Sequence, residues 1–350
     1  MILRSKIPLR ISLNGGGTDV DPYSEKFGGI VVSSAINKYV YASLEERKDQ
    51  KIKIISLDYK QIVRFNIKKK IAISGNLKLI KAIIKHIGPF RKGFNLSIHC
   101  DAPTGSGLGT SGSLGSMLVM LLSKYKNKKL SKNKAAEIAL KIEREKARIS
   151  GGKQDQYAGL FGGFNLLKFK SGYKCKPKKI NLQKSFIDEL NYNCLLIYTK
   201  KNHYSNDLLD EQIKRYKKNS NKTINSLHKM KKINDTLLRH LKNTNIYEIG
   251  KFLDYTWELK KKVNPLVTTK DIDKLYKNLK KVGVTGGKIL GAGGGGYMLI
   301  LLPFYLKNKA IKIVKKHNME VSDFDFESEG IKIWSVNKKL INNKSKKYFL

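Results

Sequence analysis

The chain contains few of the residues that would build a disulfide framework or a membrane anchor. Cysteine occurs only three times in 350 residues, at Cys100, Cys175 and Cys194. A small, odd number of widely spaced cysteines predicts neither a disulfide scaffold nor a zinc site, and it indicates a reducing compartment. The longest apolar run, residues 297–306, contains a proline, and the segment after Met1 lacks the long apolar core of a secretory signal. We therefore expect a soluble cytoplasmic protein with no membrane partner.

Acidic residues are also scarce, since 28 Asp and Glu stand against 70 Lys and Arg and the formal net charge is +42. Such a charge raises nucleic acid as a partner. The lysines are nevertheless scattered through every expected element, as at Lys231 and Lys232, and form no block or stripe interleaved with aromatic residues. We interpret them as a solvated surface that can steer anionic substrates, and we expect no specific nucleic-acid partner. A nucleic-acid-binding module is the alternative from a different functional class.

Apolar residues make up 41% of the chain, whose length is enough for two hydrophobic cores. Alternating or β-branched apolar residues predict strands at residues 2–13, 30–44, 52–57, 62–67, 94–100, 163–169, 194–199, 297–302, 319–326 and 331–336. Apolar residues at helical spacing predict helices within residues 77–87, 114–125, 135–149, 207–262, 271–282 and 306–316. This mixture predicts an α+β fold with a domain boundary near residues 170 to 190.

The most informative segment is residues 103–113, Pro-Thr-Gly-Ser-Gly-Leu-Gly-Thr-Ser-Gly-Ser, which stands just before an apolar helical run. Its glycines let backbone N–H groups turn toward an anion without a Cβ in the way. The N-terminus of the helix that follows adds the positive end of a dipole. The segment therefore predicts a phosphate-binding loop.

Two common nucleotide motifs fit this loop poorly. Residues 107–112 match G-x-G-x-x-G, but the dinucleotide-binding fold also needs an acidic residue about 20 positions later, and residues 130–134 supply none. Neither Gly152-Lys153 nor Gly287-Lys288 has the flanking residues of a Walker A loop. A second match to the glycine pattern, residues 291–296, precedes a strand rather than a helix. A nucleotide loop of another kind remains.

Four blocks, residues 10–19, 103–113, 151–156 and 291–296, resemble in order and spacing the GHMP kinase superfamily, which includes galactokinase, homoserine kinase, mevalonate kinase and phosphomevalonate kinase. The resemblance covers nearly the whole chain. It implies a two-domain α+β fold, with a ribosomal protein S5 domain 2-like N-terminal domain in residues 1–185 and a ferredoxin-like C-terminal domain in residues 186–350. It also implies an ATP- and Mg2+-dependent kinase that acts on a small molecule, as a monomer or homodimer.

The resemblance assigns roles to individual residues. Asp155 matches the catalytic Asp of the family and Arg10 the Arg near the reacting phosphate. The phosphates of ATP would contact Gly105, Ser106, Gly107, Leu108, Gly109, Thr110, Ser111, Gly112 and Ser113, and Mg2+ would be held by Ser111 and Glu143. The acceptor would contact Gly16, Gly17, Thr18, Asp19, Gly152, Lys153, Gly293 and Gly294. Galactokinases have Glu-His at the positions of Gly16-Gly17, so the sugar contacts differ.

Three of these carboxylates also have structural interpretations. Asp19 could cap a helix before Asp21-Pro22, and Asp155 could cap a helix that starts after Gly152. Glu143 could be a solvated helix residue paired with a basic neighbour, and Glu145 lies close enough to be confused with it.

Within the superfamily, the Gly-Gly-Gly-Thr-Asp and Gly-Gly-Lys-Gln-Asp-Gln-Tyr-Ala blocks look most like the D-glycero-D-manno-heptose 7-phosphate kinases, and fucokinase domains share much of this pattern. The resemblance implies phosphorylation of the C1 hydroxyl of the heptose 7-phosphate, toward nucleotide-activated heptose for surface polysaccharide. An L-fucose or other free-sugar kinase is the alternative, and a member that has lost catalysis is a third. Candidate ligands of the 7-phosphate, chosen by nearness in sequence, are Arg148, Lys153, Lys200, Lys201 and His203. Val63 and Phe65 are candidates for the adenine site.

Overall fold

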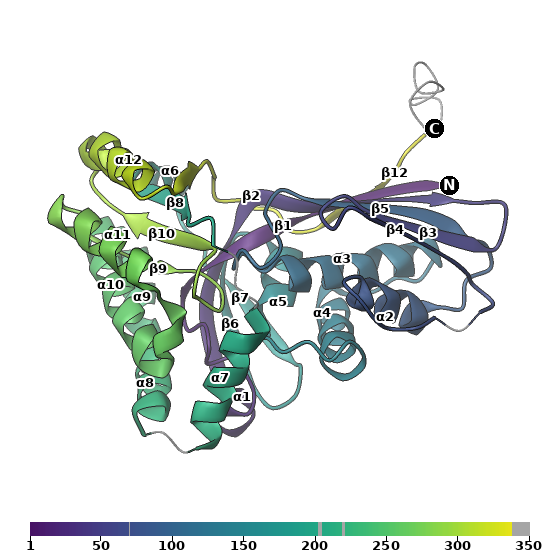
Figure 1. Cartoon of the computed structure of the whole chain (residues 1–350), viewed down its shortest axis with the longest axis horizontal. Coiled ribbons are helices and arrows are strands. Elements are labelled where there is room, and N and C mark those ends of the chain that lie inside the picture. Colours follow the sequence, from purple (N-terminus) through teal and green to yellow (C-terminus); the bar gives the residue numbers. More distant parts are fainter. Residues whose placement is uncertain (70, 202–204, 219–220, 338–350) are drawn as a thin grey trace.

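The computed structural model describes residues 1–69, 71–201, 205–218 and 221–337, and it contains two β-sheets with helices packed against them (Figure 1). Within these residues the first sheet has eight strands and the second has four. The α+β prediction is confirmed. None of the described helices is long and apolar enough to cross a lipid bilayer.

The first sheet has the order β12-β1-β2-β5-β3-β4, and β6 and β7 extend it from the other part of β2. Its strands are β1 (Ile2–Asn14), β2 (Gly29–Glu46), β3 (Lys51–Ser56), β4 (Gln61–Asn66), β5 (Phe94–Cys100), β6 (Phe164–Phe169), β7 (Cys175–Lys179) and β12 (Lys332–Ser335). One face carries the helices α2 (Lys78–Ile87), α3 (Thr110–Tyr125), α4 (Lys132–Lys141) and α5 (Gln154–Phe161) (Figure 1). The second half of β1 is buried on both faces, which explains its nearly continuous apolar sequence.

The second sheet is antiparallel, in the order β11-β8-β10-β9, with β8 (Cys194–Tyr198), β9 (Gly286–Ile289), β10 (Tyr297–Leu301) and β11 (Glu320–Ser322). Its helices are α6 (Lys184–Tyr192), α7 (Ser205–Lys217), α8 (Asn221–Lys232), α9 (Asn234–Lys242), α10 (Ile246–Val263), α11 (Lys270–Lys281) and α12 (Lys307–Lys316). Leu196 and Leu299 of this sheet belong to the same buried cluster as Leu9 and Leu121 of the first part. The two parts therefore share a continuous core.

Some predicted elements differ from the structure. The helix expected at residues 135–149 ends as α4 at Lys141, and a π-helical turn, Ile142–Lys146, follows it. The strand expected at residues 319–326 pairs as β11 over Glu320–Ser322 and again in an isolated bridge between Phe326 and Ile36. The short helix α1 (Tyr23–Phe27), β7, α6 and β9 were not predicted. The sequence of β9, Gly-Gly-Lys-Ile, has little strand propensity, and its pairing with β10 supplies the conformation.

The last strand of the chain returns to the first sheet. β12 pairs with the start of β1, with Leu3 opposite Ser335 and Lys6 opposite Lys332. The division predicted at residues 185 and 186 falls inside α6, and it assigns β12 to the part of the chain that holds the second sheet. The division therefore cuts a helix and separates β12 from its own sheet, while the number and extent of domains stay a prediction.

Candidate active site

The glycine loop before α3 has a left-handed backbone at every second residue. Gly105, Gly107 and Gly109 have φ values of 76°, 84° and 81°, and α3 begins at Thr110. Only glycine adopts this conformation without strain, so the Gly-x-Gly-x-Gly spacing is a requirement of the turn. Such a loop at a helix N-terminus presents backbone N–H groups and a positive dipole end to an anion.

Most of the predicted phosphate-binding residues line one cavity of about 170 Å3, namely Gly105, Ser106, Gly107, Gly109, Thr110 and Ser111. The other three lie behind it. The Leu108 carbonyl accepts from the Arg10 backbone N–H at 3.1 Å, and the Ser113 hydroxyl donates to the Pro8 carbonyl at 3.4 Å. Gly112 lets α3 approach α5, because a Cβ there would lie 2.5 Å from the Cβ of Asp155.

The late glycine cluster, residues 291–296, packs on this loop from the second sheet. A Cβ on Gly291 would lie 2.4 Å from the Cα of Gly107, and the Tyr297 N–H donates to the Ser106 carbonyl at 3.0 Å. The cluster therefore supports the phosphate loop. Gly293 and Gly294, the two predicted to contact the acceptor, lie instead against Val267 and do not line the cavity. Gly291 and Ala292 line it.

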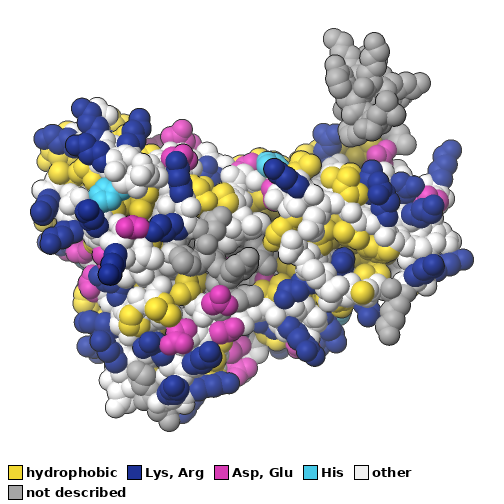
Figure 2. Space-filling model, in the orientation of Figure 1, with side chains coloured by type: hydrophobic (Ala, Val, Ile, Leu, Met, Phe, Trp, Pro, Cys, Tyr) yellow, Lys and Arg dark blue, Asp and Glu magenta, His cyan; other side chains and the backbone are white. Residues whose placement is uncertain are grey.

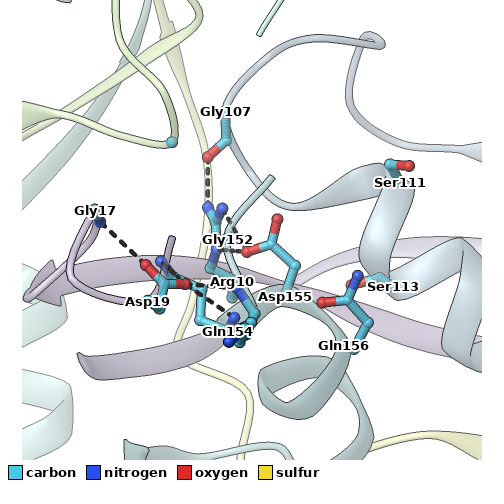
Figure 3. Close-up of polar contacts among 12 residues, drawn as sticks. Arg10, Gly17, Asp19, Gly107, Ser111, Ser113, Gly152, Gln154, Asp155 and Gln156 are labelled. Atoms are coloured by element: carbon cyan, nitrogen blue, oxygen red, sulfur yellow. Dashed lines mark hydrogen bonds and ion pairs between the residues drawn. The ribbon is translucent and has the colours of Figure 1, made fainter. Parts of the chain in front are cut away.

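Arg10 and Asp155 form an ion pair and both line the cavity (Figure 3). The Nε and Nη2 atoms of Arg10 lie 2.8 and 2.7 Å from Oδ1 of Asp155, and Nη1 donates to the Gly107 carbonyl. The side chain of Arg10 is 4% exposed and that of Asp155 is 23% exposed. The pair therefore ties the phosphate loop to α5 and leaves part of the Asp155 carboxylate open to the cavity.

Asp19 caps the helix that carries Asp155. Its Oδ2 accepts from the backbone N–H groups of Lys153 and Gln154 at 2.8 and 3.0 Å and from Nε2 of Gln154 at 3.2 Å. Its Oδ1 accepts from the Gly17 N–H at 3.0 Å (Figure 3). Burial, and then the charge of Asp155, raise the pKa of the Asp19 carboxyl. Asp19 therefore caps α5 and not the short helix α1 that follows Asp21 and Pro22. Asp19 also lines the cavity.

Ser111 and Glu143 meet as the resemblance implied. The Ser111 hydroxyl donates to Oε1 of Glu143 at 2.8 Å, across from α3 to the π-helical turn. Oε2 of Glu143 accepts from the Gln156 amide and lies 3.1 Å from Nη1 of Arg144. Glu143 is 4% exposed, so it is not a solvated helix residue, and burial raises the pKa of its carboxyl. A π-helical turn in this place is typical of functional sites.

The donors at this corner fit a magnesium ion. A hydroxyl and a carboxylate at a helix N-terminus are hard oxygen ligands, and Mg2+ takes its remaining ligands from phosphate and water. Within the described residues there is no group of three or more His, Cys, Asp and Glu side chains that could hold a metal alone. A shared site completed by nucleotide phosphates is consistent with both facts.

Lys153 does not face the cavity as predicted. Its Nζ lies 2.6 Å from Oδ1 of Asp21 and 2.8 Å from Oγ of Ser24, and the residue is 1% exposed. The ammonium therefore anchors the segment around α1, and only the backbone N–H of Lys153 serves the site, through Asp19. Sequence proximity to Gly152 gave no information about the direction of the side chain.

The remaining acceptor candidates divide between the cavity and its supports. Gly16, Gly17 and Gly152 line the cavity, and Gly152 leaves room for Asp19, since a Cβ there would lie 2.3 Å from Oδ2. Thr18 is fully buried, and its hydroxyl bonds to the Gly15 and Ile30 carbonyls within the loop.

The predicted 7-phosphate ligands do not form a cluster. Lys200 pairs with Glu320 at 2.5 Å and Lys201 pairs with Asp271, both outside the cavity lining. Arg148 is exposed and does not line the cavity either. His203 lies outside the described residues.

Two lysines that the sequence analysis did not single out are buried beside Arg10. Nζ of Lys260, on α10, donates to the Ile289 carbonyl at 3.0 Å and to the Gly291 carbonyl at 2.7 Å. Nζ of Lys288, on β9, donates to the carbonyls of Ser12 and Leu13 at 3.0 and 3.3 Å. Burial, with repulsion from neighbouring cations, lowers the pKa of Lys260 well below its usual range and that of Lys288 to about 7. The sequence does not distinguish these two lysines, because they are two among 70 Lys and Arg residues.

A second cavity, of about 490 Å3, opens on the other side of the phosphate loop. It shares Gly105, Thr110, Ser111 and Ile149 with the first cavity and extends between β3, β5 and α2. Its polar groups come from Ser56, Asp58, Tyr59, Asn76 and Thr104. Val63 and Phe65, the predicted adenine contacts, do not line it.

Comparison with known proteins identifies the family of the chain. The family model for the GHMP kinases N terminal domain matches residues 76–163. The chain is 31% identical over 338 residues to D-glycero-alpha-D-manno-heptose 7-phosphate kinase of Campylobacter jejuni, covering 95% of this chain and 99% of that protein. It is 27% identical over 328 residues to L-fucokinase/L-fucose-1-P guanylyltransferase of Bacteroides fragilis, covering 86% of this chain and 34% of that protein. The crystal structure of a D-glycero-D-manno-heptose 1-phosphate kinase from Bacteroides thetaiotaomicron superposes with a TM-score of 0.80 at 28% identity, covering 96% of this chain and 99% of that one. The chain belongs to the GHMP kinase family.

Proposed function

We propose that this ATP-dependent sugar kinase transfers the γ-phosphoryl group to the anomeric C1 hydroxyl of D-glycero-D-manno-heptose 7-phosphate and forms the 1,7-bisphosphate. The C. jejuni relative, similar over nearly the full length of both chains, carries that substrate in its name. The name of the B. thetaiotaomicron structure also specifies a phosphorylated heptose, but with the phosphate at C1, the position that we propose is phosphorylated here. Both names support an acceptor that already bears phosphate.

The observation that carries the proposal is the Arg10 and Asp155 pair beside the phosphate loop. Phosphoryl transfer depends mainly on positioning and on neutralising charge. Asp155 would orient the acceptor hydroxyl and accept its proton, and Arg10 holds that carboxylate while adding positive charge near the reacting phosphate.

The nucleotide would bind across the phosphate loop. Its phosphates would lie over residues 105–111 at the α3 N-terminus, and its base and ribose would occupy the second cavity. Ser111 and Glu143 would hold Mg2+, which supplies charge neutralisation of the phosphates when it is bound. Gln156 and Arg144 keep the Glu143 carboxylate in place.

The test is ATP consumption in the presence of Mg2+ with D-glycero-D-manno-heptose 7-phosphate, L-fucose and galactose supplied separately. Asp155→Asn should lower kcat with the accepted sugar by about 100-fold to 10,000-fold. Asp188→Asn is the matched control, because Asp188 is exposed on α6 and, among the described residues, forms an ion pair with Lys184 alone.

Each outcome decides one part of the proposal. Turnover with the heptose phosphate alone, lost in Asp155→Asn, supports both the reaction and the acceptor. Preference for L-fucose would make the protein a free-sugar 1-kinase, consistent with its similarity to the B. fragilis fucokinase. Undiminished turnover in Asp155→Asn would refute the role of Asp155.

The charge distribution on the face shown in Figure 2 gives no support to a specific nucleic-acid partner. Lys and Arg side chains are spread over the visible face and alternate with acidic and uncharged ones, rather than forming one stripe (Figure 2). We keep a monomer or homodimer and a cytoplasmic location as predictions.

A further inference from the structure

Lys260 and Lys288 are buried cations to which the mechanism above gives no role. They are 9% and 4% exposed, and their ammonium groups donate only to backbone carbonyls in the described contacts. Neither forms an ion pair with a carboxylate in the described part of the chain. The other two cations of the main cavity differ, since Arg10 pairs with Asp155 and Arg144 with Glu143. No carboxylate of the described residues therefore balances the charge of either lysine when it is protonated, and burial lowers the pKa of both.

Both lysines line a narrow recess of about 10 Å3 that continues the main cavity of about 170 Å3. A recess of this size holds about one water molecule, so a larger anion would lie where the recess opens into the main cavity, beside Lys260. The recess shares Gly16, Gln154 and Lys260 with that cavity. It is also lined by Ser12 and Asn14 of β1. Three of its residues, Ser12, Asn14 and Gln154, each have a buried side-chain oxygen (Oγ, Oδ1 and Oε1) without a hydrogen-bond partner among the described residues. A buried hydroxyl and two buried amide oxygens without partners are unfavourable unless a ligand completes them.

The combination is suited to a phosphate monoester of the acceptor. Buried cations are stabilised by an anion that accepts hydrogen bonds from them, and a phosphate dianion can accept from both ammonium groups and from the Ser12 hydroxyl. Amide oxygens at Asn14 and Gln154 can accept from sugar hydroxyls. Burial without a counterion disfavours the charged form of an amine, so a bound anion would stabilise both lysines in that form.

The position of the recess separates this anion from the nucleotide. None of residues 105–113 lines it, nor do Glu143 and Asp155. It adjoins Gly15 and Gly16, in the segment predicted to contact the sugar. We propose that Lys260 and Lys288 bind the phosphate group that the acceptor sugar already carries, and that they select phosphorylated over unphosphorylated sugars. This inference rests on the proposed function, since it deepens the description of the same acceptor.

The test compares two acceptors that differ only in that phosphate, D-glycero-D-manno-heptose 7-phosphate and D-glycero-D-manno-heptose. Lys260→Met and Lys288→Met each remove a charge while keeping most of the side-chain volume. Lys262→Met is the matched control, because Lys262 lies in the same last turn of α10 and is exposed. For each variant we expect kcat/KM with the phosphorylated acceptor to fall by about 100-fold, mainly through KM, and that with the free heptose by less than about fivefold.

The ratio between the two acceptors is the decisive quantity. Loss of discrimination supports the proposal. A merely structural role, or a contact to the transferred phosphoryl group, would lower kcat/KM with both acceptors by the same factor. An equal fall with both acceptors, or no fall, would overturn it.

A second readout keeps the inference testable if the wild-type protein uses neither heptose, which would count against the proposed function alone. Inorganic phosphate is titrated calorimetrically into protein saturated with a non-hydrolysable ATP analogue and Mg2+, so that the nucleotide site is filled. Wild type and Lys262→Met should bind phosphate, and Lys260→Met and Lys288→Met should bind it at least about tenfold more weakly. Equal binding by all four proteins, or none by the wild type, would contradict the lysine site.

Discussion

Replacing Lys288 with methionine should change how the stability of the protein depends on pH. Burial, and then repulsion from Arg10, lower the pKa of the Lys288 ammonium from 10.5 to about 7. The unfolded chain therefore binds more protons at this residue between about pH 7 and pH 10.5, and the wild type gains stability as the pH rises through that window. The variant lacks this titration. Loss of the buried charge raises the free energy of unfolding of the variant relative to the wild type. This gain is fully present below pH 7 and disappears toward pH 10.5.

Two contributions of opposite sign set the size of the effect. One pKa unit corresponds to about 1.4 kcal/mol, so relief from the buried charge amounts to about 5 kcal/mol at low pH. Methionine also leaves the Ser12 and Leu13 carbonyl oxygens without their donor, at about 1 to 3 kcal/mol each. These contributions nearly cancel, so stability at a single pH is uninformative. Only the charge contribution varies with pH, and the difference between variant and wild type should fall by about 2 to 3 kcal/mol from pH 6 to pH 9.

The assay is urea denaturation of wild type, Lys288→Met and Lys262→Met at several values between pH 6 and pH 9, at constant ionic strength and without phosphate. Phosphate is omitted because it would bind the lysines and stabilise the wild type. Lys262 is exposed, so its variant should follow the wild type at every pH. A difference between Lys288→Met and wild type that stays constant over this range would refute the argument that Lys288 is a destabilised, titrating cation.

Three further substitutions test the site. Glu143→Gln removes the carboxylate beside Ser111 and should raise the Mg2+ concentration for half-maximal activity by at least about tenfold, whereas an unchanged Mg2+ titration would exclude a metal role. Gly112→Ala places a Cβ 2.5 Å from that of Asp155 and should lower kcat by about 100-fold in steady-state assays, and activity near wild type would show that α3 and α5 tolerate the contact. Asp19→Asn places an amide group against the first N–H groups of α5, and it should lower the free energy of unfolding, measured by urea denaturation, by about 1 to 3 kcal/mol. Unchanged stability would show that Asp19 does not stabilise α5 as a cap.

The phosphate loop could be predicted, because its conformation depends on residues close together in the sequence. Gly105, Gly107 and Gly109 are needed for backbone conformation, and their spacing shows in the sequence whatever surrounds them. The meeting of Arg10 with Asp155 could not come from spacing, because they lie on different elements, and the family resemblance supplied it. The same holds for the contact of Ser111 with Glu143.

The part that could not be predicted depends on side-chain direction and burial. Lys153, next to a site glycine, turns toward Asp21, whereas Lys260, in a run of three lysines, is buried at the cavity. No local pattern distinguishes them from the other cations of this chain. The capping of α5 by Asp19 was hidden for a similar reason, since the bond joins residues 134 positions apart.

The pairing of β12 with the first residues of β1 has a consequence for the synthesis of the chain. Leu3 emerges from the ribosome among the first residues and finds its partner Ser335 only near the end of translation. Until then, one edge of the first part of β1 has exposed N–H and C=O groups in an apolar strand, a form that pairs readily with other chains. Nascent chains and C-terminal truncations that lack β12 should therefore depend on chaperones more than the full chain does.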